Sequence, residues 1–250
     1  MSGVFAGALV PHAPVLLPEA VGEDVAAETR SVREAAGALS FGDAEVVVML
    51  SPHASASGVY ASVAGSLDTF GIKGVELQRR TDPALIATLS ERWDKPMLDG
   101  PLDHGAVVPL LLLDTGTTPI VVAGLREIGD DPRALDAALA DGFSFGEAIS
   151  RSSEDQATAV IVSAHTSSAL TPRAPLTERA EAKQVEAAVL RSLRGDPSAL
   201  RSSLTDLWRL GGSCSPGPLA AYASLFAGRA SEVLAYGYPF GVGYVVARPR

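Results

Sequence analysis

The stretch VVVMLSPHAS, residues 46–55, joins an apolar, β-branched run to an abrupt break. Such a run predicts a strand that is buried on both faces, and the Ser51-Pro52 pair is expected to end it. His53 should therefore lie at the carboxyl end of a buried strand. Because α/β proteins bind their ligands at this edge of the sheet, the stretch predicts both a sheet and a functional histidine at its edge.

Other segments of the chain share this short, apolar character. With residues 45–50, the predicted strands are 4–10, 119–125, 158–163, 232–236 and 243–247. Between them lie helical patterns at 25–39, 83–93, 132–149, 176–193, 197–210 and 218–226. Strands that alternate with helices predict an α/β fold, a layered structure with a central, mostly parallel or mixed β-sheet flanked by helices.

Asp-Pro pairs mark the start of several predicted helices. Asp82, Asp131 and Asp196 are each followed by proline. An aspartate can cap the N-terminus of a helix, and proline fits the first helical position because no donor is needed there. These pairs therefore predict where three helices begin.

Length and composition are those of an ordinary globular protein. The 250 residues are 47% hydrophobic and 20% charged, and no linker divides them, which predicts one domain over residues 1–250. The net charge of −9 disfavours nucleic-acid binding, which needs clustered Lys and Arg. Apolar runs such as 106–113 are too short to span a membrane, and the sequence does not open like a signal peptide. We therefore expect a cytoplasmic protein with a small-molecule ligand or a protein partner.

The sequence contains four histidines, and His12, His53 and His165 each come near the end of a predicted strand. Because the carboxyl ends of parallel strands meet at one edge, these side chains can share a cleft. Two histidines with a carboxylate would leave positions on a ferrous ion open for substrate and dioxygen. In the alternative interpretation, the Pro-His pairs only bind their own loops, and His104 caps the apolar segment that follows it.

Five motifs are spread over nearly the whole chain: PHAPVLLPE (11–19), SPHA (51–54), DHGAVVPLLLL (103–113), SAHTSSALTPRAP (163–175) and PFGVGYVVA (239–247). In order and spacing they resemble the class III extradiol ring-cleavage dioxygenases, in particular small bacterial proteins similar to the catalytic B subunit. The resemblance implies an oxidoreductase of aromatic compound metabolism. Its reaction would insert both atoms of dioxygen into a small catechol- or aminophenol-type ring, next to the diol.

The same resemblance implies a metal site. In this family two histidines and a glutamate bind Fe(II), and a further histidine acts as acid and base beside the substrate. Carried over by motif, His12 and His53 take the two metal positions, and His104 lies near the substrate pocket. The implied cofactor is Fe(II), with zinc or manganese as alternatives. The implied partners are the aromatic substrate, dioxygen, and a second copy or a second subunit.

The motif around residue 165 departs from the family pattern. Ser168 occupies the position of the acid/base histidine, whereas His165 lies three residues earlier. We expect His165 to act as a catalytic residue together with His104. On an extended segment, residues three apart face opposite sides, so this role requires the backbone to turn.

A second departure affects the predicted metal site. Gly237 stands where relatives often have a carboxylate, so Glu232 is the predicted third ligand and Glu19 its alternative. Cys214 has no Lys, Arg or His beside it and is predicted to be inert. Two further functions remain open: a degenerate homologue that serves as a binding or partner subunit, and a metal enzyme of other chemistry, such as one that activates water on zinc.

Overall fold

Residues 46–54 form strand β2 (Val46–Ala54), near the middle of an eight-stranded sheet. The structure, a computed structural model, describes residues 3–250. Contrary to the prediction, Ser51-Pro52 does not end the strand. It interrupts the pairing with the neighbouring strand β7 between Ser51 and Ala54, and the strand continues past His53. His53 therefore lies in the last residues of β2.

The sheet has the strand order β6-β3-β7-β2-β8-β1-β10-β9. Its other strands are β1 (Gly3–Val10), β3 (Gly58–Tyr60), β6 (Met97–Leu98), β7 (Ile120–Arg126), β8 (Ala157–Ser163), β9 (Ser231–Gly237) and β10 (Tyr244–Pro249). The central strands β7, β2, β8 and β1 are mutually parallel, whereas β10 runs antiparallel to β1 and β9 antiparallel to β10. The mixed, mostly parallel sheet confirms the predicted fold class.

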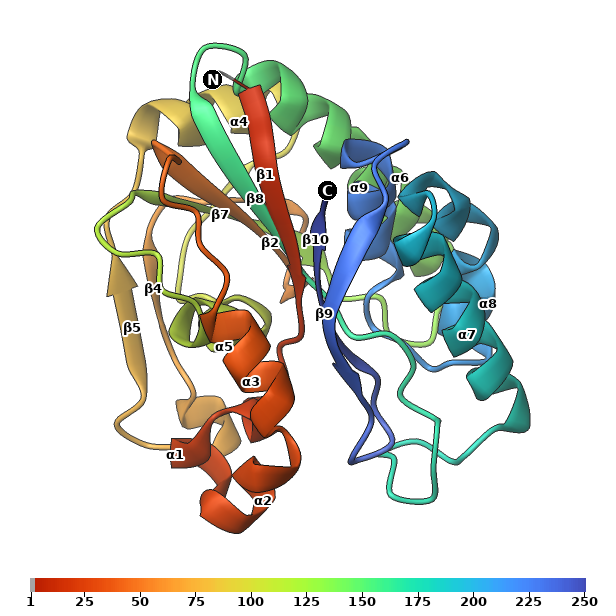
Figure 1. The fold of residues 1–250 in the computed structure, drawn as a ribbon. Coiled ribbons are helices and arrows are strands. Elements are labelled where there is room, and N and C mark those ends of the chain that lie inside the picture. Colours follow the sequence, from red (N-terminus) through yellow and green to blue (C-terminus); the bar gives the residue numbers. More distant parts are fainter. Residues whose placement is uncertain (1–2) are drawn as a thin grey trace.

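Alternate residues of the central strands supply two hydrophobic cores, one on each face of the sheet. Val46, Val48 and Leu50 belong to one core, and Val47 and Met49 to the other. Burial on both faces explains why β2 reads as a continuous apolar run. The chain is thus a three-layer structure, with the sheet between two layers of helices (Figure 1).

The two layers that cover the sheet are built from different helices and turns. One contains α1 (Pro18–Val21), α2 (Glu23–Glu28), α3 (Arg30–Gly37), α5 (His104–Leu112) and the 3-10 turn η1 (Pro14–Leu16), with the small sheet of β4 (Val63–Ser66) and β5 (Glu76–Arg79). The other contains α4 (Pro83–Trp93), α6 (Pro132–Ser152), α7 (Ala180–Arg194), α8 (Leu204–Arg209), α9 (Pro216–Leu225) and the 3-10 helix η3 (Pro197–Ser202). A further 3-10 turn, η2 (Asp68–Phe70), lies between β4 and β5.

The predicted helix starts are confirmed by hydrogen bonds. Asp82, Asp131 and Asp196 each accept a backbone N–H, at 3.0, 2.9 and 2.9 Å. Helix α5 was not predicted, because it is apolar on nearly every side and is buried, so its sequence has no helical periodicity. The pattern at 176–193 becomes helical only at Ala180, because the preceding residues form an irregular segment that bonds to other loops.

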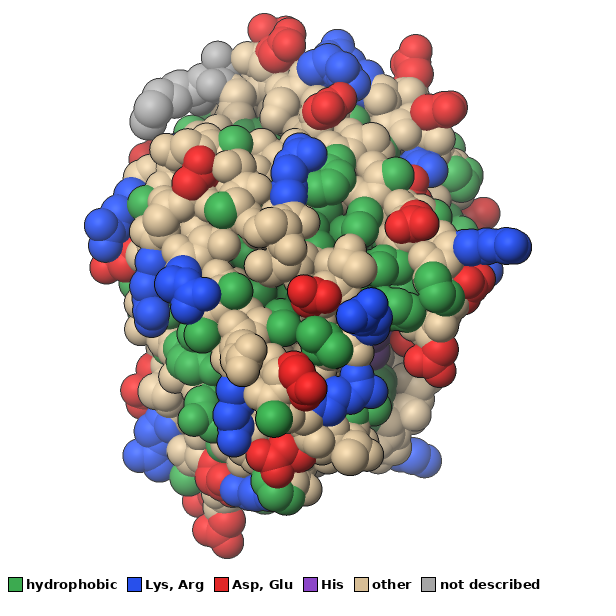
Figure 2. All heavy atoms as spheres, turned by 90° about the vertical axis from the view of Figure 1, so that its right-hand side faces the viewer, with side chains coloured by type: hydrophobic (Ala, Val, Ile, Leu, Met, Phe, Trp, Pro, Cys, Tyr) green, Lys and Arg blue, Asp and Glu red, His purple; other side chains and the backbone are tan. Residues whose placement is uncertain are grey.

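No helix in residues 3–250 is long and apolar enough to cross a membrane. On the face of the molecule drawn in Figure 2, acidic and basic side chains are interspersed, and a histidine side chain is visible in a recess between them. At least one histidine side chain is therefore visible from this surface.

Candidate metal centre

The structure brings all four histidines together at the carboxyl edge of the parallel strands. His12 follows β1, His53 lies at the end of β2 and His165 follows β8, which runs between those two strands. His104 is the first residue of α5. The ring centroid of His12 lies 3.8 Å from that of His165 and 5.0 Å from that of His53, and the centroids of His53 and His104 are 4.2 Å apart.

Two of these histidines and one cysteine form a group that could hold a metal ion. Ligand atoms of His12, His53 and Cys214 all lie within 4.8 Å of one another. The two Nε2 atoms are 3.2 Å apart, and Sγ of Cys214 is 3.5 Å from Nε2 of His12. Tetrahedral bonds of about 2.05 Å to nitrogen and about 2.3 Å to sulfur require separations of about 3.3 and about 3.6 Å. The spacing therefore fits one shared ion.

The other ring nitrogens of both histidines have partners that fix how the rings point. Nδ1 of His53 lies 3.2 Å from Oε1 of Glu127, and Nδ1 of His12 lies 2.9 Å from Oγ of Ser163. Histidine ligands of metal ions usually donate their second N–H to such a carboxylate or hydroxyl group, which leaves Nε2 for the ion. Glu127 and Ser163 thus supply the support that a metal centre needs.

Cys214 is held by the two serines beside it. Oγ of Ser213 donates to the carbonyl of His165 at 3.0 Å, and Oγ of Ser215 accepts from the backbone N–H of His165 at 2.9 Å. Farther along, the N–H of Ser168 bonds to the carbonyl of Gly211 at 2.7 Å. The loop 211–215 is therefore bonded to the segment that follows β8. These bonds place the thiol of Cys214 next to the histidines.

The prediction that Cys214 is inert rested on its sequence neighbours and missed this contact. Its partner His12 is 202 residues away in the sequence. The one local signal is that the cysteine lies between two serines, after a Gly pair and before the proline that starts α9. That signal marks a bonded loop but does not identify a ligand.

The pKa of His53 is shifted in the opposite direction from those of His104 and His165. Burial lowers its pKa, but the thiol of Cys214 and the carboxylates of Asp103 and Glu127 outweigh burial and raise the pKa to about 9. Burial and then the charge on His53 lower the pKa of His104 to about 4 and that of His165 to about 3. At neutral pH the imidazoles of His104 and His165 are therefore neutral.

His104 is positioned by the residue before it. The carboxylate of Asp103 accepts hydrogen bonds from Ser51 at 2.5 Å and from Tyr60 at 3.2 Å, which fastens the start of α5 to β2 and β3. Gly105, the residue after His104, must be small, because a Cβ at this position would lie 2.4 Å from Oγ of Ser51. The DHG motif thus stacks the ring of His104 on that of His53.

The backbone bends where the predicted role of His165 required it to turn. After β8 the segment leaves the sheet and bends at Ser168, and His165 and Ser168 line the same pocket. Nδ1 of His165 is buried and has no hydrogen-bond partner among the described residues. Buried polar atoms are nearly always paired, so an unpaired nitrogen on a residue that lines the pocket marks His165 as a candidate functional group.

Glu232 does not join the histidines. Its carboxylate is 2.9 Å from the guanidinium of Arg248, its partner in the β9–β10 pairing. Arg248 is four residues along β10 from Tyr244, which lies beside His165; at about 3.4 Å per residue this is roughly 14 Å. Glu19 is an exposed residue of α1. Cys214 therefore replaces both carboxylates as the candidate third ligand.

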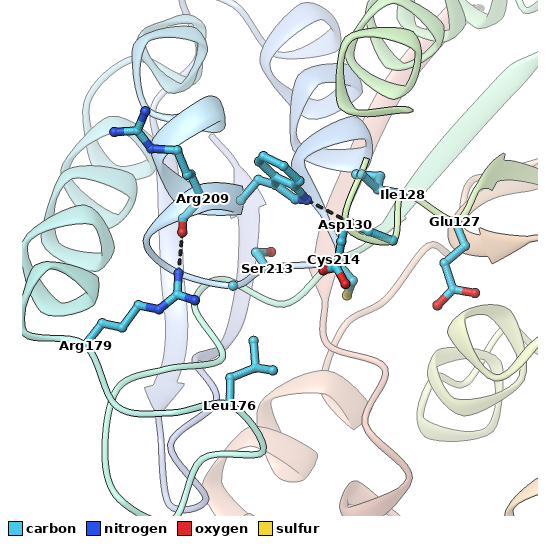
Figure 3. Close-up of a pocket in the computed structure, with 11 residues that line it drawn as sticks. Glu127, Ile128, Asp130, Leu176, Arg179, Arg209, Ser213 and Cys214 are labelled. Carbon is cyan, nitrogen blue, oxygen red and sulfur yellow. Dashed lines mark hydrogen bonds between the residues drawn. The ribbon is translucent and has the colours of Figure 1, made fainter. Parts of the chain in front are cut away.

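A pocket of about 560 Å³ opens onto this group. Its polar lining consists of the four histidines, Cys214, Ser168 and Arg173, and the rest of its wall is mainly apolar, including Val15, Phe70, Phe240, Val242 and Tyr244. A second cavity, of about 490 Å³, reaches Cys214 from the side of Glu127 and Arg179. The guanidinium of Arg179 donates a hydrogen bond to the backbone carbonyl of Arg209. In Figure 3, Cys214 and Ser213 lie between these two residues and the side chain of Glu127. The first pocket has the size and lining of a small-molecule site.

Comparison with known proteins shows the fold. No family model matches the sequence, and no curated protein matches it either. Among solved structures, the chain is similar to uncharacterized protein JW3007 from Escherichia coli K12, with a TM-score of 0.64 and 14% sequence identity over 97% of this chain and 98% of that chain. The two chains therefore share an architecture over nearly their full lengths, and the function of this one has to be inferred from its site.

Proposed function

We propose that this protein is a metal-dependent enzyme whose ion is held by His12, His53 and Cys214. The observation that carries the proposal is the convergence of two Nε2 atoms and one Sγ atom at the floor of an open pocket. Three protein ligands with a position left for water or substrate are typical of catalytic rather than structural metal sites. The bound ion would supply Lewis acidity and, if it is iron, a path for electrons to dioxygen.

We propose that the reaction is the ring-opening oxygenation of a small catechol or aminophenol. The lining includes the side chains of Phe70, Phe240 and Tyr244, which suit an aromatic ring. A catechol must lose a proton to bind through its oxygens, and the imidazoles of His104 and His165 line the pocket where those oxygens would lie. In this proposal His165 supplies the acid/base group that Ser168 lacks.

A second candidate is a zinc enzyme that activates water. It is favoured by the thiolate of Cys214, a softer ligand than the expected glutamate, and by ligand spacings that fit tetrahedral coordination. Here His165 would accept the proton of the attacking water. The two candidates share the metal site and differ in the ion and in the need for oxygen.

Metal content tests the shared part of the proposal. The protein is purified without oxygen, and its metals are measured by mass spectrometry beside a His12→Ala, His53→Ala double variant. Glu232→Gln is the matched control, because this carboxylate lies outside the site. We expect nearly one iron or zinc per chain in the wild type and the control, and little in the double variant. Equal, negligible metal in all three would contradict a metal-dependent function and leave a binding or partner subunit.

Oxygen consumption separates the two candidates. Iron-loaded protein is mixed with a panel of catechols and aminophenols in an oxygen electrode, and ring opening is followed by the yellow product. We expect one oxygen molecule per ring opened, and a loss of turnover in His165→Gln with its metal content retained. Zinc in the purified protein and no oxygen uptake after iron loading would reject the dioxygenase and favour the hydrolytic enzyme.

A further inference from the structure

One wall of the metal pocket comes from a part of the chain that supplies none of the metal ligands. Phe70 ends the 3-10 turn η2, between β4 and β5, and its ring meets that of His104 edge-on, with centroids 4.7 Å apart. Other apolar side chains of the lining come from Phe240, Val242 and Tyr244, at the connection between β9 and β10 and the start of β10. The apolar lining of the pocket thus comes from two separate parts of the chain.

Phe70 lines the pocket with a half-exposed side chain, on a turn that is well anchored. Phe70 is 49% exposed, whereas Leu67 in the same turn is fully buried. The carbonyl of Leu67 accepts backbone N–H groups of Phe70 at 2.9 Å and of Ile72 at 3.3 Å. The turn closes at Gly71, whose φ of 73° favours glycine. The backbone therefore fixes the ring in place without burying it.

We propose that Phe70 determines which aromatic ligands the pocket accepts. The proposal rests on the proposed function, in which an aromatic ring binds at the metal ligands. Phe70 packs against a single bound ring, and its bulk excludes a fused, two-ring ligand. Aromatic side chains prefer edge-on or offset contacts with centroids about 4.5–7 Å apart, and a ring beside His104 would lie within this range of Phe70.

Replacing Phe70 should affect binding of small and large rings in opposite directions. Phe70→Ala removes the contact with a single ring and opens space for a second one. Since the turn is held by Leu67 and Gly71, the variant should keep its fold and its metal. A residue with only a structural role would weaken both kinds of ligand together, so the ratio of the two affinities separates the two roles.

The experiment uses zinc-loaded protein, because zinc has no redox chemistry and binding can be measured without turnover. The probes are 4-nitrocatechol, followed by its visible absorbance, and 2,3-dihydroxynaphthalene, followed by its fluorescence. Wild type is compared with Phe70→Ala and Phe70→Leu. The matched controls are Lys73→Ala, an exposed residue of the same connection, and Met97→Ala, an apolar residue that is 58% exposed on β6. Zinc content is measured for each protein.

In Phe70→Ala we expect 4-nitrocatechol to bind roughly fivefold to tenfold more weakly, the loss of one aromatic contact, and 2,3-dihydroxynaphthalene to bind more tightly. The affinity ratio should shift at least tenfold, less in Phe70→Leu, and about twofold or less in the controls. An unchanged ratio, or equal weakening of both probes, would overturn the role of Phe70 and leave the proposed function intact. Failure of zinc-loaded wild type to bind either probe would overturn the aromatic ligand itself, and the role of Phe70 with it.

Discussion

The two sides of the candidate metal centre are built in different ways. His12 and His53 are carried by β1 and β2, so their positions follow from the order and register of the sheet. Cys214 is carried by a loop whose Ser213 donates a hydrogen bond to His165 and whose Ser215 accepts one from it. The strand side is therefore fixed by the core of the protein, and the loop side by a few polar contacts. The following variants test this difference.

The largest effect is expected at the thiol. Cys214→Ala removes one ligand, so zinc affinity should fall by at least about a hundredfold, beyond what the loss of a supporting group causes. Manganese affinity should fall much less, because manganese prefers oxygen ligands to thiolate. His12→Ala, the control on the strand side, should weaken both ions. The measurement is competition with a chromophoric chelator, and similar losses of zinc and manganese in Cys214→Ala would argue against sulfur ligation.

The next effect separates the loop from its ligand. A Ser213→Ala, Ser215→Ala double variant keeps every predicted ligand but releases the loop from His165. We expect zinc affinity to fall about tenfold to a hundredfold, the range for groups that support metal ligands. Ser202→Ala, at an exposed serine of η3, is the control. Wild-type affinity in the double variant would show that the loop holds its shape without these hydroxyls.

A smaller effect is expected from the carboxylate that supports His53. Glu127→Gln keeps an oxygen beside Nδ1 but removes the charge, and the side chain is 64% exposed, so water screens the loss. Zinc affinity should fall about tenfold at most. Asp130→Asn, on the same connection after β7, should leave it unchanged. A larger loss in Asp130→Asn than in Glu127→Gln would contradict the contact.

The smallest effect concerns stability of the segment after β8. Glu186 is buried and accepts hydrogen bonds from Thr166 at 2.5 Å and from the N–H of Ser167 at 2.9 Å. Burial raises its pKa, and these bonds offset the rise only in part. Glu186→Gln should lower the free energy of unfolding by about 1 kcal/mol at low pH, because an amide cannot accept both bonds.

That difference should shrink as the pH rises. A carboxyl group whose pKa is raised in the folded state stabilises the fold below its unfolded pKa, and this contribution is lost as the pH rises through the folded pKa. The wild type therefore loses stability relative to Glu186→Gln above the ordinary glutamate range. Urea unfolding of both proteins at pH 4 and pH 8 measures the change. A gap that widens with pH would mean that the carboxylate is stabilised in its charged form.

The contrast between the residues on strands and the residue on a loop also explains what could be predicted from the sequence. The apolar run of β2 and the Asp-Pro helix starts are local signals, because burial and capping depend on neighbouring residues. They predicted the central strands and the helix starts at Asp82, Asp131 and Asp196. The histidines could be grouped because parallel strands end at a common edge.

The rest depended on contacts that local patterns do not encode. Glu232 was assigned to a strand that does form, but it lies at the end of β9 that is far from the site. Cys214 reaches the site through hydrogen bonds between two loops, and no periodicity predicts the path of a loop. Phe70 comes from a short connection outside the motifs that suggested the function.

The separation of the ligands along the chain also bears on how the centre is assembled during synthesis. Cys214 follows His12 by 202 residues along the chain, and its loop needs the finished segment after β8. A partly made chain can present only two of the three donors. Since binding energy at a complete set of ligands is also folding energy, the ion would be captured only after the loop 211–215 has docked. Metal uptake would then report that this loop has reached the segment after β8.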